Sequence, residues 1–338
     1  MKTNYNRYLS KKSTFASVLG VNKMKILSFL KKWTLPVAIV TGVLVYIIGS
    51  YIPHIDRVSP FINRTLEIVQ PCLIFSMLFL TFCKIDLRKM RLSRWQFIIT
   101  LLQVGISFIL ALITPWVSSD MQIWIESGIL CFICPTATAA AVVTEKLGGN
   151  ISGTISYTIL INIATACTIP VLLPILSDSQ HYSFGNLATI IMARTFPLLI
   201  APMVAAWIFR TFFPKITERI NQVRNLAFYL WGVALSIAMG ITAQSVAHTS
   251  ASFGTLLGIA LVSLFCCAFQ FWAGKAIGKR FGESICAGQS FGQKNTVFAI
   301  WLGSSFMNPA TAIAGGCYSI WHNLFNTWQI QKKQSQQT

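Results

Sequence analysis

Charged residues are scarce in this chain of 338 residues. Asp, Glu, Lys and Arg make up 11% of it, and only nine residues are acidic. Apolar residues make up 54%, with 24 Phe and ten Trp, which is more apolar surface than a soluble protein of this length carries. The composition therefore excludes an ordinary soluble protein and indicates an integral membrane protein.

The shortage of acidic residues also argues against an enzyme that works within the membrane. Most acidic residues map to loops or helix ends, and no nucleophile is paired with a base within an apolar stretch. Cys131 and Cys134 form a Cys-x-x-Cys pair, but no second pair follows at a zinc-like spacing, which favours packing over metal or redox chemistry. We therefore expect no catalytic residue, no metal site and no cofactor.

The N-terminal segment lacks the apolar region of a signal peptide. Residues 1–32 are polar and basic, and we expect them to form a cytoplasmic segment. Within it, Val21–Lys32 is a short basic amphipathic stretch. Such a stretch is typical of a helix lying on an anionic inner leaflet, with binding of a partner as the alternative.

Apolar stretches near the length that crosses a bilayer recur ten times. In chain order they are Trp33–Pro53, Thr65–Phe82, Trp95–Val117, Ile123–Thr144, Ile151–Leu176, Ala193–Phe213, Asn225–Ala247, Phe253–Ala276, Ile285–Phe306 and Ala310–Ile330. We expect each to be a transmembrane helix. The predicted fold class is an all-α membrane protein, with a transmembrane domain over 33–330 and a cytoplasmic tail over 331–338.

The basic residues are distributed unevenly between the two ends of these stretches. If the N-terminus is cytoplasmic, 23 of the 27 Lys and Arg residues fall in cytoplasmic segments. This bias follows the positive-inside rule and predicts a multi-pass protein of the cell (inner) membrane with both termini cytoplasmic. The net charge of +18 is therefore explained by topology, so we expect the lipid bilayer, and not nucleic acid, as partner.

Polar residues interrupt the fourth and the ninth stretch at matching places. Pro135 breaks the fourth, and Gly288 and Gly292 loosen the ninth about 155 residues later. Each half then holds five spans with a broken fourth, over about 33–177 and about 184–330. Because five is odd, the halves are expected to be inverted repeats, a pattern that indicates a transporter. The alternative is that the proline only kinks a helix and Gly292 only permits close packing.

Lys294 lies in the second of these breaks, beside Gln293 and Asn295. Ionisable groups within the bilayer are costly and usually functional. Irregular backbone at that depth is tolerated only where protein buries it or water reaches it. We therefore expect a polar cavity here, with a lysine that snorkels to the inner surface as the alternative.

Three stretches resemble the bile acid:sodium symporter family. Residues 134–150 (CPTATAAAVVTEKLGGN) resemble its broken fourth helix, and 292–299 (GQKNTVFA) its broken ninth. Pro309 to Asn323, ending in Trp-His-Asn, resembles its last helix. The resemblance covers roughly 30–330. It implies alternating-access transport of organic anions with two sodium ions, and a core of spans three to five and eight to ten in which the broken helices cross.

The chain departs from the family at most of its sodium-binding positions. Ala140 and Ala141 replace a Ser and an Asn, Ser290 replaces a shared Glu, and Lys294 replaces a Gln. The family's oxygen-bearing residues persist as Gln103, Thr154 and Thr158.

We therefore predict sodium-independent transport, with the Lys294 ammonium in place of a sodium ion and hydrogen-bonded to Gln103 and nearby carbonyls. Lys294 could carry a proton, act as a fixed cation in uniport or exchange, or pair with an anionic substrate. A sodium-coupled symporter with altered sites is the alternative.

The family's substrate contacts carry over as Thr138, Asn295, His322 and Asn323. Hydroxyl, amide and imidazole donors can solvate a carboxylate or a sulfonate, so the expected partner is a small organic anion. For His322 the alternative is a core histidine bonded to a carbonyl. For the whole chain the alternatives are a non-transporting receptor on the same fold and a permease for metalloid oxyanions. The sequence specifies neither the substrate nor the oligomeric state.

Overall fold

The computed structural model describes residues 36–53, 55–84, 92–176, 183–223 and 226–336, and these residues form helices and short connections. A helix over Pro36–Ser50 comes first. The labelled elements are α2 (Ile55–Cys83), α3 (Arg94–Ile113), η2 (Thr114–Trp116), α4 (Ser119–Ile133), α5 (Ala140–Lys146), α6 (Ile151–Leu176), α7 (Phe184–Phe212), α8 (Pro214–Gln222), α9 (Leu226–His248), α10 (Phe253–Lys279), α11 (Ser284–Gly292), α12 (Thr296–Phe306) and α13 (Ala312–Ser335). The expected amphipathic stretch Val21–Lys32 lies outside the described residues.

Six helices of the described chain are long and apolar enough to cross a membrane. They cover Val58–Cys83, Arg94–Trp116, Ile151–Leu176, Phe184–Phe212, Tyr229–His248 and Phe253–Lys279. Shorter apolar helices cover Pro36–Ser50, Met121–Ile133 and Thr296–Phe306. These helices make the chain an all-α, multi-pass membrane protein, as expected from its composition.

Two helices begin well before the apolar stretches that predict them. α2 starts at Ile55 instead of Thr65, and α7 starts at Phe184 instead of Ala193. The α7 start is capped by Ser183, whose side chain accepts a hydrogen bond from the Asn186 N–H. Apolarity marks the part of a helix that lies in hydrocarbon, whereas the hydrogen-bonded helix continues into polar surroundings. For the same reason α13 extends to Ser335, into the predicted tail.

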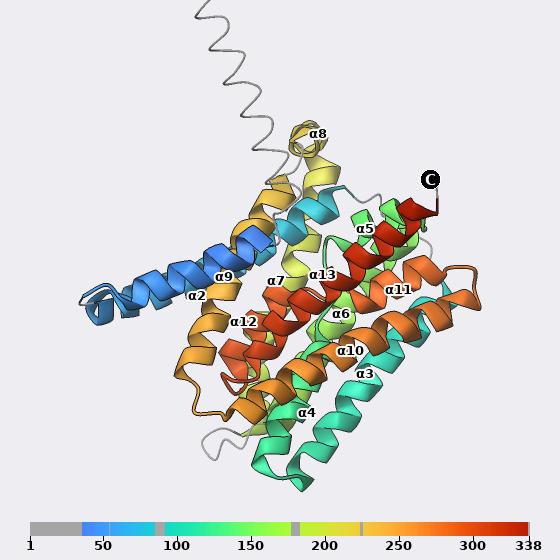
Figure 1. The fold of residues 1–338 in the computed structure, drawn as a ribbon. Helices are drawn as coiled ribbons and strands as arrows, with labels where there is room; N and C mark the ends of the chain where they lie inside the picture. The colour runs from blue at the N-terminus through green and yellow to red at the C-terminus, as the bar shows by residue number, and fades with distance from the viewer. Residues whose placement is uncertain (1–35, 54, 85–91, 177–182, 224–225, 337–338) are drawn as a thin grey trace, which may run out of the picture.

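The helices form two groups, which are joined most extensively where α6 packs on α7. In the first, which we call the core bundle, α10 packs on α11, α13 and α4, while α3 packs on α4 and α6. In the second, the flanking group, α2 packs on both α7 and α9, and the helix Pro36–Ser50 lies against α9. The resemblance assigns the same helices to the two groups. In Figure 1 the core bundle occupies the right-hand side, and the first two helices project to the left.

A close backbone approach holds the first helix on α9. A side chain at Gly42 would collide with the Ser236 carbonyl, and one at Gly240 would lie 3.2 Å from the Gly42 oxygen. Beside this crossing, Ala38 packs on Leu235 and Met239. Small residues are typical of helix contacts in membranes, because they let two backbones approach.

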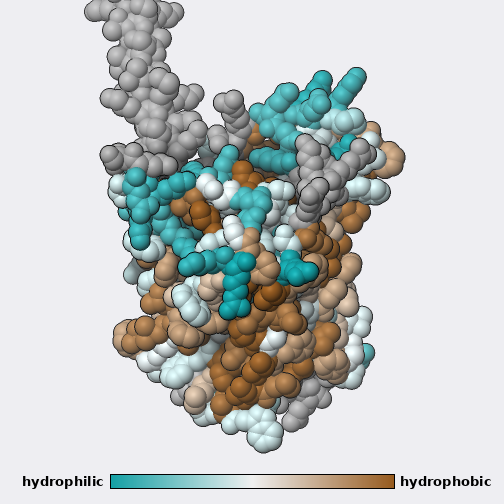
Figure 2. Space-filling view, turned by 90° about the vertical axis from the view of Figure 1, so that its right-hand side faces the viewer, coloured by the Kyte–Doolittle hydropathy of each residue, from teal (hydrophilic) through white to brown (hydrophobic). Residues whose placement is uncertain are grey.

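The surface divides into a hydrophilic end and a broad apolar belt (Figure 2). The hydrophilic end lies at the top, where Figure 1 shows α8. The belt includes large apolar side chains that are exposed in the monomer, such as Leu101, Phe265 and Trp272. An apolar belt of this kind fits a chain surrounded by lipid.

Candidate functional site

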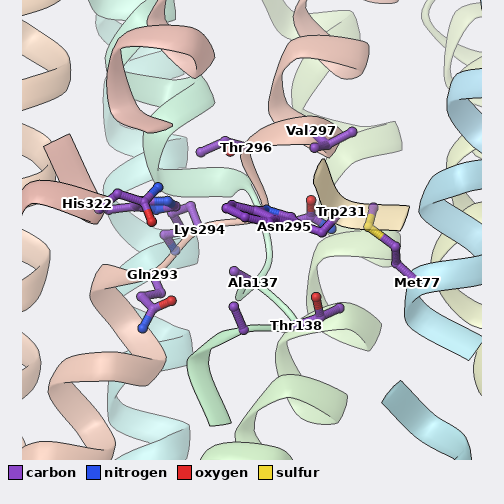
Figure 3. A pocket seen from close by; sticks show the side chains of 12 residues that line it. Met77, Ala137, Thr138, Trp231, Gln293, Lys294, Asn295, Thr296, Val297 and His322 are labelled. Carbon is purple, nitrogen blue, oxygen red and sulfur yellow. The ribbon is translucent and has the colours of Figure 1, made fainter. Parts of the chain in front are cut away.

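Two broken helices meet through their unwound segments. α4 ends at Ile133 and α5 begins at Ala140, whereas α11 ends at Gly292 and α12 begins at Thr296. The two breaks pair as a short antiparallel bridge between Thr136 and Lys294. Two backbone hydrogen bonds close it, from Ala137 N–H to the Gln293 oxygen (2.9 Å) and from Asn295 N–H to the Pro135 oxygen (2.8 Å). Figure 3 shows the two extended segments passing each other.

Side chains from other helices satisfy the carbonyls that the breaks set free. Gln270 of α10 donates to the Cys131 oxygen, and Thr165 of α6 donates to the Ile133 oxygen. At the end of α11, the Tyr318 hydroxyl of α13 donates to the Gly292 oxygen at 2.9 Å. Unpaired backbone groups are costly in hydrocarbon, so these bonds make the breaks stable features.

The Lys294 ammonium lies at the crossing, and its side chain is only 1% exposed. Its Nζ donates to Oε1 of Gln103 at 2.7 Å and to the Phe132 carbonyl at 3.2 Å. The Tyr157 hydroxyl also donates to Gln103 Oε1, while Gln103 Nε2 donates to the Cys134 oxygen. Lys294 therefore does not snorkel to the surface, and it has the amide partner that its sequence position suggests.

Several neutral groups together accommodate this cation. Phe132 lies in the last turn of α4, where the carbonyls carry the negative end of the helix dipole. The Phe291 ring centroid lies 5.1 Å from Nζ, within reach of a cation–π interaction. The two acceptors of the Lys294 hydrogen bonds are an amide oxygen and a carbonyl oxygen, both neutral. The site thus offers neutral oxygens to the Lys294 amino group, and neutral oxygens are also what a sodium ion needs.

Among the described residues, the hydroxyls of the other expected ion-site residues, Thr154, Thr158 and Ser290, make no hydrogen bond to Lys294. The Thr154 hydroxyl lies 3.0 Å from that of Thr144 and 3.3 Å from the Cys286 sulfur. Thr158 donates to the Thr154 carbonyl of its own helix. The Ser290 hydroxyl is buried without a hydrogen-bond partner among the described residues. With Ala140 also buried, this region offers few oxygen atoms for a cation.

The four expected substrate residues line one small cavity: Thr138, Asn295, His322 and Asn323. Met77 of α2 and Trp231 of α9 close its far side, so the cavity lies between the core bundle and the flanking group. Figure 3 shows side chains from both groups around it. Residues that are far apart in the sequence are therefore brought to one place beside the crossing.

Some polar side chains of the cavity already have hydrogen-bond partners, and others do not. The Asn295 side chain caps α12 by accepting from the Phe298 N–H at 3.2 Å, and Asn323 donates to the Ser319 oxygen. His322 packs edge-on against Tyr318, and its Nδ1 has no partner among the described residues. The amino end of α12, with its positive dipole, also borders the cavity. The positive end of α12 and the unpaired His322 ring nitrogen are the groups that an anion could use here.

Sequence reasoning missed two tyrosines that support the crossing, Tyr157 and Tyr318. Both are buried, and both donate a hydrogen bond at the site. A tyrosine inside an apolar stretch needs a partner for its hydroxyl, and this requirement was the available signal. Gln270 is another buried polar residue within an apolar stretch, and it donates to the Cys131 carbonyl.

A bundle of apolar helices with two broken helices meeting beside a cavity defines a multi-pass membrane protein of the transporter type. A family model described as the Sodium Bile acid symporter family matches residues 70–249, and the chain therefore belongs to this family of membrane transporters. The match includes the break in α4/α5 and ends before α10. No individual curated protein matches the chain.

Proposed function

We propose that this protein is a sodium-independent secondary transporter of a small organic anion, bile-acid-like or a carboxylate. One observation carries the proposal: the Lys294 ammonium is buried at the crossing of the broken helices, bound to Gln103 and the Phe132 carbonyl. An ammonium there supplies the charge that a bound sodium ion supplies in the relatives that the sequence resembles. Alanines at 140 and 141 and the serine at 290 take away oxygen ligands at the same time.

Ten spans arranged as two inverted five-helix repeats, about 33–177 and about 184–330, account for the two matched breaks. Each repeat then contributes one broken helix to the crossing. In alternating access the core bundle would move against the flanking group. The cavity has Met77 and Trp231 on one side and the crossing on the other. A motion of the core bundle against the flanking group would open and close a path for the substrate there.

The expected cargo follows from the groups around the cavity. Asn295, His322 and Thr138 are neutral polar side chains that can hydrogen-bond a carboxylate or a sulfonate. Apolar side chains on the flanking side suit the hydrocarbon part of the same molecule. This combination supports an organic anion over an inorganic one.

The test is uptake into vesicles that contain the purified protein. A thermal-shift screen against bile acids, keto acids and pantothenate-like acids first selects a binding anion. Uptake of that anion is then measured with sodium present and with choline in its place, at several pH values. We expect equal rates in both media; a strict need for sodium would overturn the proposal, and binding without uptake would indicate a receptor. A pH-dependent rate would indicate that Lys294 carries a proton, and a pH-independent rate that it is a fixed cation.

A further inference from the structure

One face of α13 is polar and buried beyond the cavity. His322, Asn326 and Gln329 follow one another at helical spacing and are 5%, 6% and 8% exposed. Each has a side-chain atom that is buried without a hydrogen-bond partner among the described residues: Nδ1, Oδ1 and Nε2, respectively. Buried polar groups are rarely left unpaired, so a row of three points to a polar occupant.

Amide side chains of α11 and of the break after it continue this face. Gln293 donates to Gln289 Oε1, and Gln289 Nε2 lies 3.5 Å from Gln329 Oε1. Gln293 and His322 also line the central cavity. The polar side chains therefore run without interruption from the cavity along the space between α11 and α13. We call these five residues the α11–α13 seam.

Lysines stand at the far end of this seam. Half-buried Lys275 packs its side-chain stem beside Gly288, where an added Cβ would lie 2.5 Å from its Cγ. Lys275 also lies close enough to Lys332 for the two positive charges to repel. Lys333 reaches the turn at Gly148, which has a φ of +72°. The Glu283 carboxylate also lies at this end, where it accepts from Asn150 Nδ2 at 2.8 Å. The three lysines outnumber it, and an excess of positive charge favours an anion.

We propose that the α11–α13 seam is a second binding subsite for the transported organic anion, on its way between the central cavity and the lysine-bearing end. Carboxylate and sulfonate oxygens only accept hydrogen bonds, so they match the free Gln329 N–H group and the lysines. The unpaired Asn326 Oδ1 is itself an acceptor and needs a donor such as water. An apolar helix contact would use leucines at these places and leave no orphan polar atoms. The proposal rests on the proposed function for the identity of the cargo.

The test measures access of an organic anion to the seam in the full-length protein. Asn326→Cys and Gln329→Cys are made singly and treated with a sulfonate-bearing and a trimethylammonium-bearing methanethiosulfonate in inside-out vesicles. Phe325→Cys is the matched control, because Phe325 has the same depth on α13 but stacks on Phe271 of α10. The unsubstituted chain reports background from its native cysteines. Each rate is divided by that reagent's rate with a free small thiol.

We expect both seam cysteines to react with the sulfonate reagent at least about tenfold faster than Phe325→Cys, as exposed thiols do. The normalised rate with the sulfonate reagent should also exceed that with the trimethylammonium reagent by about tenfold, because the lysines concentrate anions near the seam. Equal rates at all three positions would show that the seam is closed packing. Preference for the cationic reagent would show a water-filled gap without an anion subsite. Labelling needs no transport and no sodium, so either result is independent of the uptake test.

A second measurement asks whether the subsite contributes to transport. Gln329→Leu removes the free amide, and Gln331→Leu is its control on the exposed side of α13. We expect the first to raise the anion concentration for half-maximal uptake while the second leaves it unchanged. Equal values in the two variants would overturn a role in binding the cargo.

Discussion

The two breaks in the helices differ in origin and in what they contribute. The break after α4 contains Pro135, which removes a backbone donor, and its side chains are small. The break after α11 follows Gly292 and carries Gln293, Lys294 and Asn295. The first break therefore offers carbonyl oxygens and the second offers a cation and amides. Their antiparallel pairing lets each supply what the other lacks, which two identical breaks could not do.

The comparison explains why a lysine is tolerated at this depth. The Phe132 carbonyl at the end of α4 accepts from the Lys294 amino group. Gln103 Oε1 accepts from the same group, and Gln103 Nε2 donates to the Cys134 carbonyl. A cation on the α4 side would face only the dipole of its own helix end and small side chains. The charge is thus stabilised across the crossing.

Replacing Lys294 has the largest expected effect. Lys294→Met keeps the length but leaves Gln103 Oε1 and the Phe132 oxygen without this donor. If each lost hydrogen bond costs about 1–3 kcal/mol, the fraction of protein in the transport-competent conformation falls by about 30-fold or more. We expect the rate of uptake to fall as much. Vesicle uptake at matched protein amounts measures it. Lys279→Met, at the exposed end of α10, should behave as the unsubstituted chain. Normal uptake by Lys294→Met would show that the ammonium is not needed.

Restoring ion ligands near both breaks should convert the protein from sodium-independent to sodium-dependent uptake. A variant combining Ala140→Ser, Ala141→Asn, Ser290→Glu and Lys294→Gln places oxygen ligands at the positions that the resemblance assigns to sodium binding. We expect its uptake to require sodium, whereas that of Lys294→Gln alone stays low in both media. Sodium-independent uptake by the combined variant would contradict the replacement of an ion by Lys294.

Local sequence predicts the breaks but not the contacts that stabilise them. Proline, glycines and a cluster of polar residues within apolar stretches were enough to locate both interruptions. The contact between Lys294 and Gln103 followed from the family resemblance, which aligns two distant positions. The hydroxyls of Thr154 and Thr158 were expected in an ion site, yet they bond to neighbouring groups of α5, α6 and α11. A hydroxyl can satisfy itself on its own helix, which no sequence position reveals.

The seam on α13 escaped prediction for a related reason. Its polar residues have helical spacing, but spacing does not show whether that face meets lipid, water or another helix. The amides of α11 became relevant only when the fold placed them opposite. Ten apolar stretches likewise predict helices without assigning their partners, and the division into a core bundle and a flanking group came from the resemblance.

Substituting Gly292 has an intermediate expected effect, because the second break depends on close packing. An added Cβ at this position would collide with the buried ring of Phe271 on α10. We expect Gly292→Ala to cost about 1–3 kcal/mol and to lower the midpoint of thermal unfolding by roughly 3–10 °C. Gly105→Ala is the matched control, since nothing lies within 4 Å of its added Cβ. An equal shift of the unfolding midpoint in both variants would mean that the effect of Gly292→Ala comes from helix propensity and not from the contact with Phe271.

The smallest expected effect concerns how the two half-helices begin after the breaks. Asn295 caps α12 with its side chain, whereas Ala139 precedes α5 in a helical conformation (φ −75°, ψ −14°) and has no side-chain cap. We expect Asn295→Ala to lower the free energy of unfolding by about 0.5–2 kcal/mol, measured as a lowered unfolding midpoint. We expect Ala139→Asn to add little stability, because a capping residue needs an extended backbone. Asn295→Ser keeps a capping oxygen and removes the amide. Preserved stability with weaker anion uptake would then separate the role of Asn295 in the cavity from its role in the helix. A stability gain from Ala139→Asn as large as the loss from Asn295→Ala would show that the two breaks begin their half-helices in the same way.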